Sequence, residues 1–230
     1  MLELLKKAFG KQAVVVAELP SRFEDNPASV WASARGLAVQ QRDKGKGVAI
    51  DGTVMGKAWR LEIGKPSRHF IRTEELRARS DLGLDPNVGV LIMNRHLKQA
   101  LEKQAYERYT DTLQTQADVT MPEEIRWLSV YDEFGWESLP NAFWDRYCVL
   151  ADDRANALAW LDAPLAELLM SWPALATNAQ TPFMLLLLRG KAYLRMEYQP
   201  ATVPTLQHAS GIFTSACESA LGAFGMRSAV

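Results

Sequence analysis

The side chains best suited to nucleophilic, acid–base or metal chemistry are scarce in this chain. Its 230 residues include three histidines (His69, His96 and His208) and two cysteines (Cys148 and Cys217). No two of them stand at the short spacing of a zinc site or a vicinal dithiol. The sequence also lacks the Gly-x-Ser-x-Gly and His-Glu-x-x-His motifs of common hydrolases. It therefore predicts no catalytic residue, no metal site and no cofactor, and it favours a protein without enzymatic activity.

An enzyme whose site is assembled from distant segments is the alternative. The candidate pair for a hydrolase or transferase is His69 with a carboxylate from residues 118–153, because catalytic groups commonly meet only in the fold. Spacing places no carboxylate beside any of the three histidines, so each is expected to have a structural role. Both cysteines lie on apolar segments, where thiols behave as small hydrophobic groups.

A group of basic residues between positions 60 and 79 is the best candidate for a binding site. Because side chains alternate along a strand, Arg68 and Arg72 would share a face, as would Arg77 and Arg79. Neighbouring guanidinium groups bind phosphate or carboxylate through paired hydrogen bonds. The competing interpretation is a solvated sheet face with weak ion pairs to nearby glutamates. The candidate anion-binding residues are Arg60, Arg68, His69, Arg72, Arg77 and Arg79.

Charge is unevenly distributed, although the formal net charge is only -1. Residues 56–103 contain 10 Lys and Arg against 6 Asp and Glu, whereas residues 104–170 contain 4 against 13. This division fits two halves that pack on each other, two copies that pair, or a basic pocket beside an acidic rim. A net charge so near zero argues against a nucleic-acid partner.

Aromatic residues are concentrated in residues 117–147, which we interpret as an acidic connector. Seven large aromatic side chains in these 31 residues are more than most linkers carry. Exposed, they would mark a partner surface. Buried, they would hold two halves together, and burial is favoured because large exposed apolar patches are rare on monomers. The interface candidates are Trp127, Tyr131, Trp136 and Trp144.

Two N-terminal motifs only superficially resemble functional signals. Lys44-Gly45-Lys46-Gly47 lacks the Gly-Lys-Ser/Thr ending of a phosphate loop and precedes an expected strand, so no helix N-terminus would support a nucleotide there. Residues 2–11 combine apolar and basic side chains in the manner of an interfacial membrane helix. A helix of about ten residues buries little apolar area, so a peripheral membrane protein is not favoured.

Composition favours a soluble, cytoplasmic protein. The 48% apolar and 23% charged residues are ordinary globular values. The longest apolar run, residues 183–188, is far shorter than the roughly 20 residues of a membrane span. The N-terminus has no signal-peptide pattern, and two distant cysteines suit unpaired thiols in a reducing compartment.

Hydrophobic patterns predict an α+β fold with antiparallel sheet and with helices packed on one face. Strands are expected at 54–63, 69–73, 75–82 and 88–93, followed by a helix at 97–113. After a strand near 148, Asp153 and Asp162 are expected to begin short helices. Gly190 would lie in a hairpin turn, and a last helix would bury residues 206–224 and end at Gly225.

Two further helix starts are expected from capping chemistry. Asn26 followed by Pro27 favours a helix whose apolar face includes Trp31, Ala34 and Ala38. Thr120 and Glu123 match a capping box.

These elements divide the chain into four parts. They are an N-terminal helical segment (1–47), a strand-rich half with its helix (48–116), the aromatic and acidic connector (117–147) and a second α+β half (148–230). A single domain over 48–230 is the alternative. The two halves share a strand-then-helix order that is compatible with duplication, although no residue-level repeat is present.

Residues 143–161, FWDRYCVLADDRANALAWL, and their continuation to 225 resemble a family of uncharacterised proteobacterial proteins. The shared pattern is a strand, an acidic pair, an Ala/Leu-rich helix, a hairpin and a terminal helix. Residues 59–62 and 75–84 show the same resemblance. It implies a bacterial origin and no particular reaction, ligand or catalytic residue.

The sequence as a whole predicts a binding or interaction module. The basic strand face would bind a small anionic ligand or an acidic partner. The aromatic connector would contact a protein partner or a second copy in a homo-oligomer. No nucleic-acid partner and no membrane span are expected.

Overall fold

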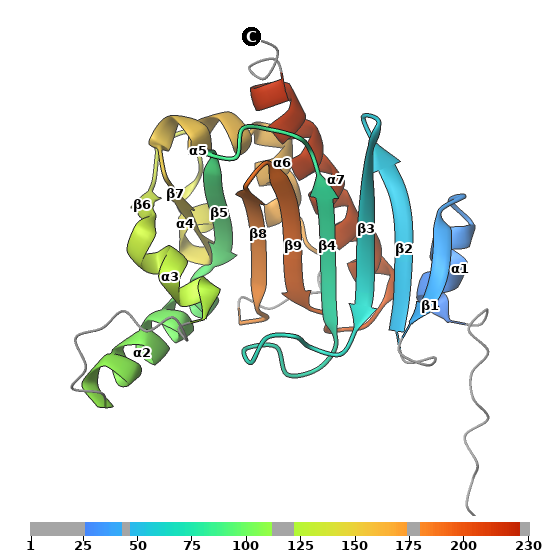
Figure 1. Ribbon diagram of the computed structural model, residues 1–230, viewed down its shortest axis with the longest axis horizontal. Coiled ribbons are helices and arrows are strands. Elements are labelled where there is room, and N and C mark those ends of the chain that lie inside the picture. Colours follow the sequence, from blue (N-terminus) through green and yellow to red (C-terminus); the bar gives the residue numbers. More distant parts are fainter. Residues whose placement is uncertain (1–25, 43–46, 112–121, 174–179, 226–230) are drawn as a thin grey trace, which may run out of the picture.

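The computed structural model describes residues 26–42, 47–111, 122–173 and 180–225. Within these residues, nine strands form one open antiparallel sheet with helices packed against it (Figure 1). The candidate helix at 2–11, the glycine-rich residues 44–46 and Thr120 lie outside the described residues.

The sheet combines strands from distant parts of the chain. Its order is β1-β2-β3-β4-β9-β8-β5-β7-β6, and each neighbouring pair is antiparallel. The C-terminal strand β9 therefore lies between β4 and β8. The strands are β1 (Ala38–Arg42), β2 (Gly47–Val54), β3 (Lys57–Gly64), β4 (Glu75–Asp81), β5 (Gly89–Asn94), β6 (Asp132–Phe134), β7 (Tyr147–Ala151), β8 (Phe183–Leu188) and β9 (Lys191–Glu197).

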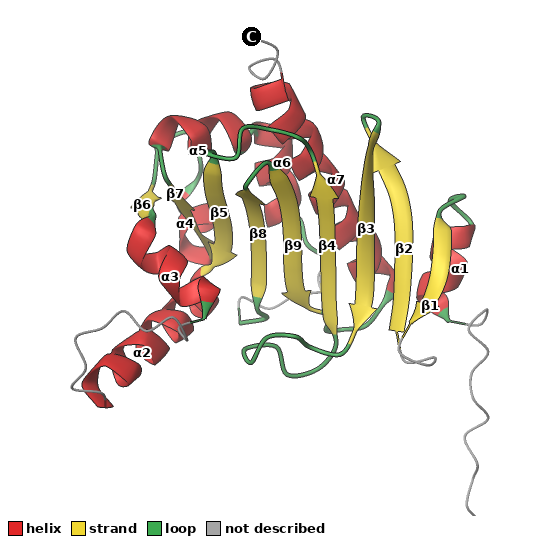
Figure 2. Ribbon diagram, viewed as in Figure 1, coloured by secondary structure: helices red, strands yellow, loops and turns green. Residues whose placement is uncertain are grey.

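The helices of the described residues fall into a long C-terminal helix and shorter ones (Figure 2). The α+β class predicted from the sequence is confirmed. The helices are α1 (Pro27–Ser33), α2 (Arg95–Asp111), α3 (Glu123–Val130), α4 (Asn141–Arg146), α5 (Arg154–Trp160), α6 (Ala163–Met170) and α7 (Val203–Phe224).

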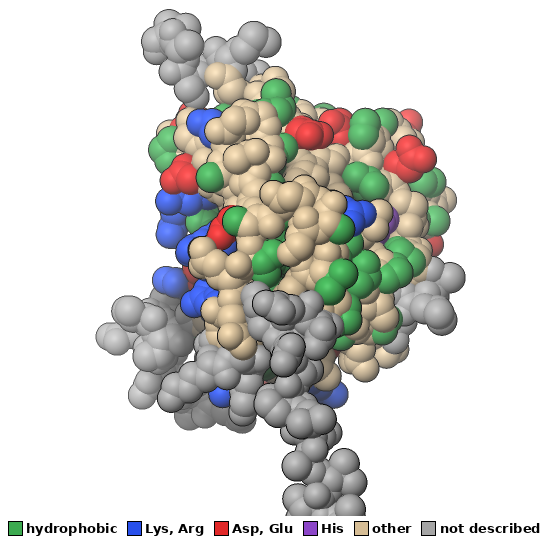
Figure 3. Space-filling view, turned by 90° about the vertical axis from the view of Figure 1, so that its right-hand side faces the viewer, with side chains coloured by type: hydrophobic (Ala, Val, Ile, Leu, Met, Phe, Trp, Pro, Cys, Tyr) green, Lys and Arg blue, Asp and Glu red, His purple; other side chains and the backbone are tan. Residues whose placement is uncertain are grey.

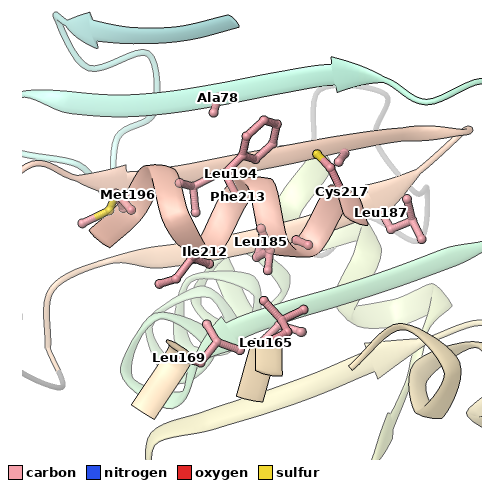
Figure 4. Packing of buried hydrophobic residues seen from close by; sticks show 14 of the residues in the cluster. Ala78, Leu165, Leu169, Leu185, Leu187, Leu194, Met196, Ile212, Phe213 and Cys217 are labelled. Atoms are coloured by element: carbon pink, nitrogen blue, oxygen red, sulfur yellow. The ribbon is translucent and has the colours of Figure 1, made fainter. Parts of the chain in front are cut away.

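The larger hydrophobic core lies between the sheet and α7. Ile212 and Phe213 of α7 belong to one buried cluster with Leu185 of β8 and Leu194 of β9 (Figure 4). Helices α1, α5 and α6 contribute to the same cluster. The sequence predicted helices on one face of the sheet, and these four helices lie together on this face.

A smaller core covers part of the opposite face. Leu91 of β5 and Leu186 of β8 cluster there with Leu97 of α2 and Ile125 of α3. Strands β5, β7 and β8 are buried at every position, so both of their faces must be covered. Helices α2 and α3 therefore lie on the side opposite α7, in addition to the helices expected on one face.

Three expected elements differ from the structure. Residues 69–73 form a loop rather than a strand, because the amides of Arg72 and Thr73 donate to the Glu197 carboxylate instead of a neighbouring strand. Residues 54–63 contain the turn between β2 and β3, at Met55-Gly56. The first helix ends at Ser33, and Ala38, which was expected on its apolar face, begins β1 after a turn.

The second half follows local signals closely. Asp153 accepts a hydrogen bond from the Ala155 amide, and Asp162 from the Leu165 amide, so both cap helices as expected. The β8–β9 hairpin turns at Arg189 and Gly190, which have positive φ values of 53° and 73°. Both residues of the turn are thus left-handed, as a type I′ hairpin turn requires.

Gly190 and Gly36 give a matched test of backbone packing. A Cβ at Gly190 would stand 2.4 Å from the Leu84 carbonyl oxygen, whereas a Cβ at Gly36 (φ +68°) would meet open space. Gly36→Ala should lower the free energy of unfolding by roughly 1–2 kcal/mol, because an alanine is strained in the left-handed backbone conformation. Gly190→Ala should lower the free energy of unfolding clearly more, as measured by urea denaturation. Equal losses for the two variants would contradict the close approach.

Candidate anion-binding site

The register of the central strands places arginines opposite arginines. Arg60 of β3 pairs with Arg79 of β4, and Arg77 of β4 pairs with Arg195 of β9. Like charges directly opposite each other destabilise a sheet. These side chains alternate with the core residues of the same strands, so they point away from α7.

The arginines surround a hollow of about 390 Å³. In Figure 3, Lys and Arg side chains gather along the left-hand margin, which corresponds to the sheet face turned towards the viewer in Figure 1. We call the five arginines of this hollow the arginine face: Arg42, Arg60, Arg77, Arg79 and Arg195.

Glu62 lies at the centre of the arginine face and is shared by several cations. Its Oε2 lies 2.7 Å from Nε of Arg77, and its Oε1 lies 3.2 Å from Nε of Arg60 and also pairs with Arg42. Arg60 has a second, longer contact of 3.4 Å to Asp51. One carboxylate shared by three guanidinium groups orients them but leaves positive charge in excess.

Arg195 is held in place by Ser67 and Glu75. Its Nη1 donates to the Ser67 hydroxyl at 2.8 Å and lies 2.9 Å from Oε1 of the buried Glu75. The contact with Glu75 Oε1 is an ion pair without hydrogen-bond geometry. Burial is the main cause that lowers the pKa of Arg195 below its usual value, and the Glu75 carboxylate opposes this shift.

Arg79 differs from its neighbours on the arginine face. Its side chain is exposed, and none of the described residues forms an ion pair or hydrogen bond with it. Its guanidinium group therefore keeps its donors available to a ligand.

The structure brings together only part of the predicted anion site. Arg60, Arg77 and Arg79 share the arginine face, which includes the expected pair at 77 and 79. Arg68 forms an ion pair with Glu124 of α3 in an adjoining hollow. Its expected shared strand face with Arg72 is wrong, because both residues lie in the 65–74 loop.

Two members of the arginine face were missed from the sequence. Arg42 ends the edge strand β1, where a helix was expected. Arg195 lies far downstream on β9 and reaches the site only through the β4–β9 pairing. The alternation of polar and apolar residues over 191–197 was the available signal for its orientation.

His69 and Arg72 line a separate hollow of about 420 Å³. The Nε2 atom of His69 lies 2.7 Å from Oε1 of Gln104, so its hydrogen-bond partner is an amide rather than a carboxylate. The carboxylate that lines this hollow is Glu197, which lies outside residues 118–153. It accepts hydrogen bonds from the Arg72 and Thr73 amides. No hydrogen-bonded pair of His69 with an acid is present among the described residues.

The four candidate interface aromatics are half-buried and do not line one surface. Trp136 and Trp144 pack edge to face with ring centroids 5.1 Å apart and line a hollow of about 620 Å³ beside Arg95. Trp127 packs against the smaller core, and Tyr131 packs against both that core and Gly89. Trp127 and Tyr131 thus attach one segment of the connector to the sheet, and Trp136 and Trp144 attach another.

The described residues also show whether a metal site or a membrane-spanning helix is present. No group of three or more His, Cys, Asp or Glu side chains there is arranged to hold a metal ion. Among the described helices, none combines the length and apolar character needed to cross a membrane.

The fold and site define an α+β protein with an open antiparallel sheet, in which the basic part of one face, over β3, β4 and β9, is not covered by any of the described helices. No protein-family model and no curated protein matches the chain. Among solved structures, it is similar to the mycobacterial trehalose monomycolate transport factor A, with a TM-score of 0.46 and 9% identity. The match covers 84% of this chain and 92% of that one. So distant a likeness carries no inference about function, and the proteobacterial resemblance stays a prediction.

The two cysteines should be chemically inert in the native protein. Cys148 and Cys217 are fully buried, and burial raises the pKa of each thiol to about 12. We expect neither to react with a disulfide reagent such as DTNB at about pH 8, where the thiolate is the attacking species. Both should react after denaturation in urea. Rapid modification of either thiol in the native protein would contradict this burial.

The raised thiol pKa values also predict a loss of stability in alkali. A cysteine in the unfolded chain ionises near its ordinary pKa of about 8.5, whereas each buried thiol stays protonated until about pH 12. The stabilisation is complete below the unfolded pKa and is lost as pH rises between these values. Urea denaturation from neutral to alkaline pH should show this decline, and Cys217→Ala should make it shallower. An unchanged slope in that variant would count against the contribution of Cys217.

Proposed function

We propose that this protein is a non-catalytic binding module whose arginine face holds an anionic ligand with a phosphate or carboxylate group. The observation that carries the proposal is the register of β3, β4 and β9, which sets Arg60 opposite Arg79 and Arg77 opposite Arg195. Folding alone does not favour such pairs. An anion bound between them offsets their repulsion and accepts charge-assisted hydrogen bonds.

The size of the hollow supports a small ligand. Its volume of about 390 Å³ falls within the roughly 300–1,000 Å³ of small-molecule sites. Glu62 and Glu75 hold Arg77 and Arg195 in fixed positions before the ligand arrives. Such preorganisation reduces the entropy that binding must overcome.

The predicted protein partner belongs to a different surface. Trp136 and Trp144 are the interface candidates that line a common hollow, so a protein partner or second copy would contact that hollow rather than the arginine face. A cytoplasmic location remains part of the same proposal.

The variant Arg79→Gln tests whether the arginine face binds a ligand or is only a solvated surface with ion pairs. Loss of a charge-assisted contact should weaken binding of methyl phosphate about tenfold by calorimetric titration. Removing one member of a like-charged pair should also raise the free energy of unfolding by roughly 0.2–1 kcal/mol. The matched control is Arg154→Gln, because Arg154 is exposed at the start of α5, on the side of the sheet that holds α7.

The control variant should change neither methyl phosphate affinity nor stability. If wild-type protein binds neither methyl phosphate nor acetate, the proposed function is wrong. If Arg79→Gln leaves the affinity for methyl phosphate unchanged, the anion does not bind at the arginine face and the proposed site is wrong.

A further inference from the structure

A second hollow adjoins the arginine face, and the two share Tyr193 and Arg195. It has a volume of about 190 Å³ and lies between α3 and the β8–β9 hairpin. Its lining differs from that of the arginine face because much of it is apolar. The apolar lining residues are Trp127 of α3 and Met184, Leu186 and Leu188 of β8.

Sheet register explains how the basic and apolar regions meet. Tyr193 of β9 lies between its strand neighbours Arg79 of β4 and Leu186 of β8. Adjacent strands are roughly 4.8 Å apart, so about 10 Å separates the strand that carries Arg79 from the strand that carries Leu186. The same face therefore changes from cationic to apolar across a single strand.

The charged side chains of the second hollow largely neutralise one another. The buried carboxylate of Glu124 pairs with Arg68, and Glu123 lies 3.8 Å from Arg189. The arginine face, in contrast, shares Glu62 among three guanidinium groups. An anion is therefore attracted to the arginine face, and the second hollow suits an uncharged group.

We propose, building on the anion-binding function, that the ligand is a compact amphiphilic anion. Its phosphate or carboxylate group binds between Arg77 and Arg79. Its apolar part, one ring or a short branched chain, passes Tyr193 and packs between Trp127 and Leu186. A hollow of about 190 Å³ is smaller than the roughly 300 Å³ at which drug-sized sites begin, so the apolar part is small.

Two ligands with the same charged group test this inference by calorimetric titration. Phenyl phosphate should bind the wild-type protein about tenfold more tightly than methyl phosphate, because its ring leaves water for the apolar hollow. Benzoate and acetate repeat the comparison for a carboxylate. Arg79→Gln should weaken both phosphate esters equally and leave the phenyl preference unchanged.

Variants of the second hollow should change only the phenyl preference. Trp127→Ala removes one wall, and Leu188→Phe fills the hollow from the end of β8, where Leu188 keeps 9% of its surface exposed. Each should reduce the preference to near unity and leave methyl phosphate affinity intact. Trp136→Ala, in the hollow beside Arg95, is the matched control and should keep the preference.

The outcomes distinguish the two proposals. Equal affinity of wild-type protein for phenyl and methyl phosphate would overturn the amphiphilic ligand and leave the anion site standing. A phenyl preference that survives both Trp127→Ala and Leu188→Phe would also overturn it. No binding of any of the four anions would overturn both proposals. Binding to phosphatidylcholine vesicles that contain phosphatidic acid, without binding to phenyl phosphate, would point instead to a lipid headgroup and contradict the compact ligand.

Discussion

The pairing of β4 with β9 is the interaction on which the rest of this structure depends. It joins residues 75–81 to residues 191–197 and so unites the strands of both halves of the chain in one sheet. In the same register, Ala78 and Leu194 face α7 while Arg77 and Arg195 face the opposite side. A slip of one residue would exchange the two faces and expose the core. The register that buries the core is therefore also the register that assembles the arginines.

Magnitudes explain why the fold tolerates opposed arginines. A directly opposed like-charged pair costs roughly 0.2–1 kcal/mol, whereas burial of one large aliphatic side chain contributes roughly 1.5–3 kcal/mol. On the face towards α7, β4 and β9 bury Leu76, Leu194 and Met196 almost completely. Hydrophobic burial thus outweighs the repulsion between the arginines many times over, and the sheet can keep a surface that is unfavourable without a bound anion.

Local chemistry could be predicted from the sequence, and long-range pairing could not. The caps at Asp153 and Asp162 and the turn at Gly190 depend on neighbouring residues, so short patterns indicate them. Residues 69–73 have the composition of a strand, but their amides bind Glu197, a residue far downstream. Arg195 likewise reaches the candidate site through a contact between distant residues, the pairing of β9 with β4. No local pattern shows that β9 will insert beside β4, so Arg195 was missed although the hairpin turn at Gly190 was expected.

The place of the proposed ligand follows from a change of strand type within one hairpin. Strand β8 is buried at all positions because α7 covers one face and α2 and α3 cover the other. Strand β9 alternates, since no described helix lies over its second face. The tight turn at Arg189-Gly190 pairs β8 directly with β9, so the fully buried strand and the alternating strand are neighbours in the sheet. An apolar surface and a cationic surface must therefore meet along Tyr193 and Arg195, and a molecule with one apolar and one anionic end is the kind of ligand that satisfies both sides of that boundary.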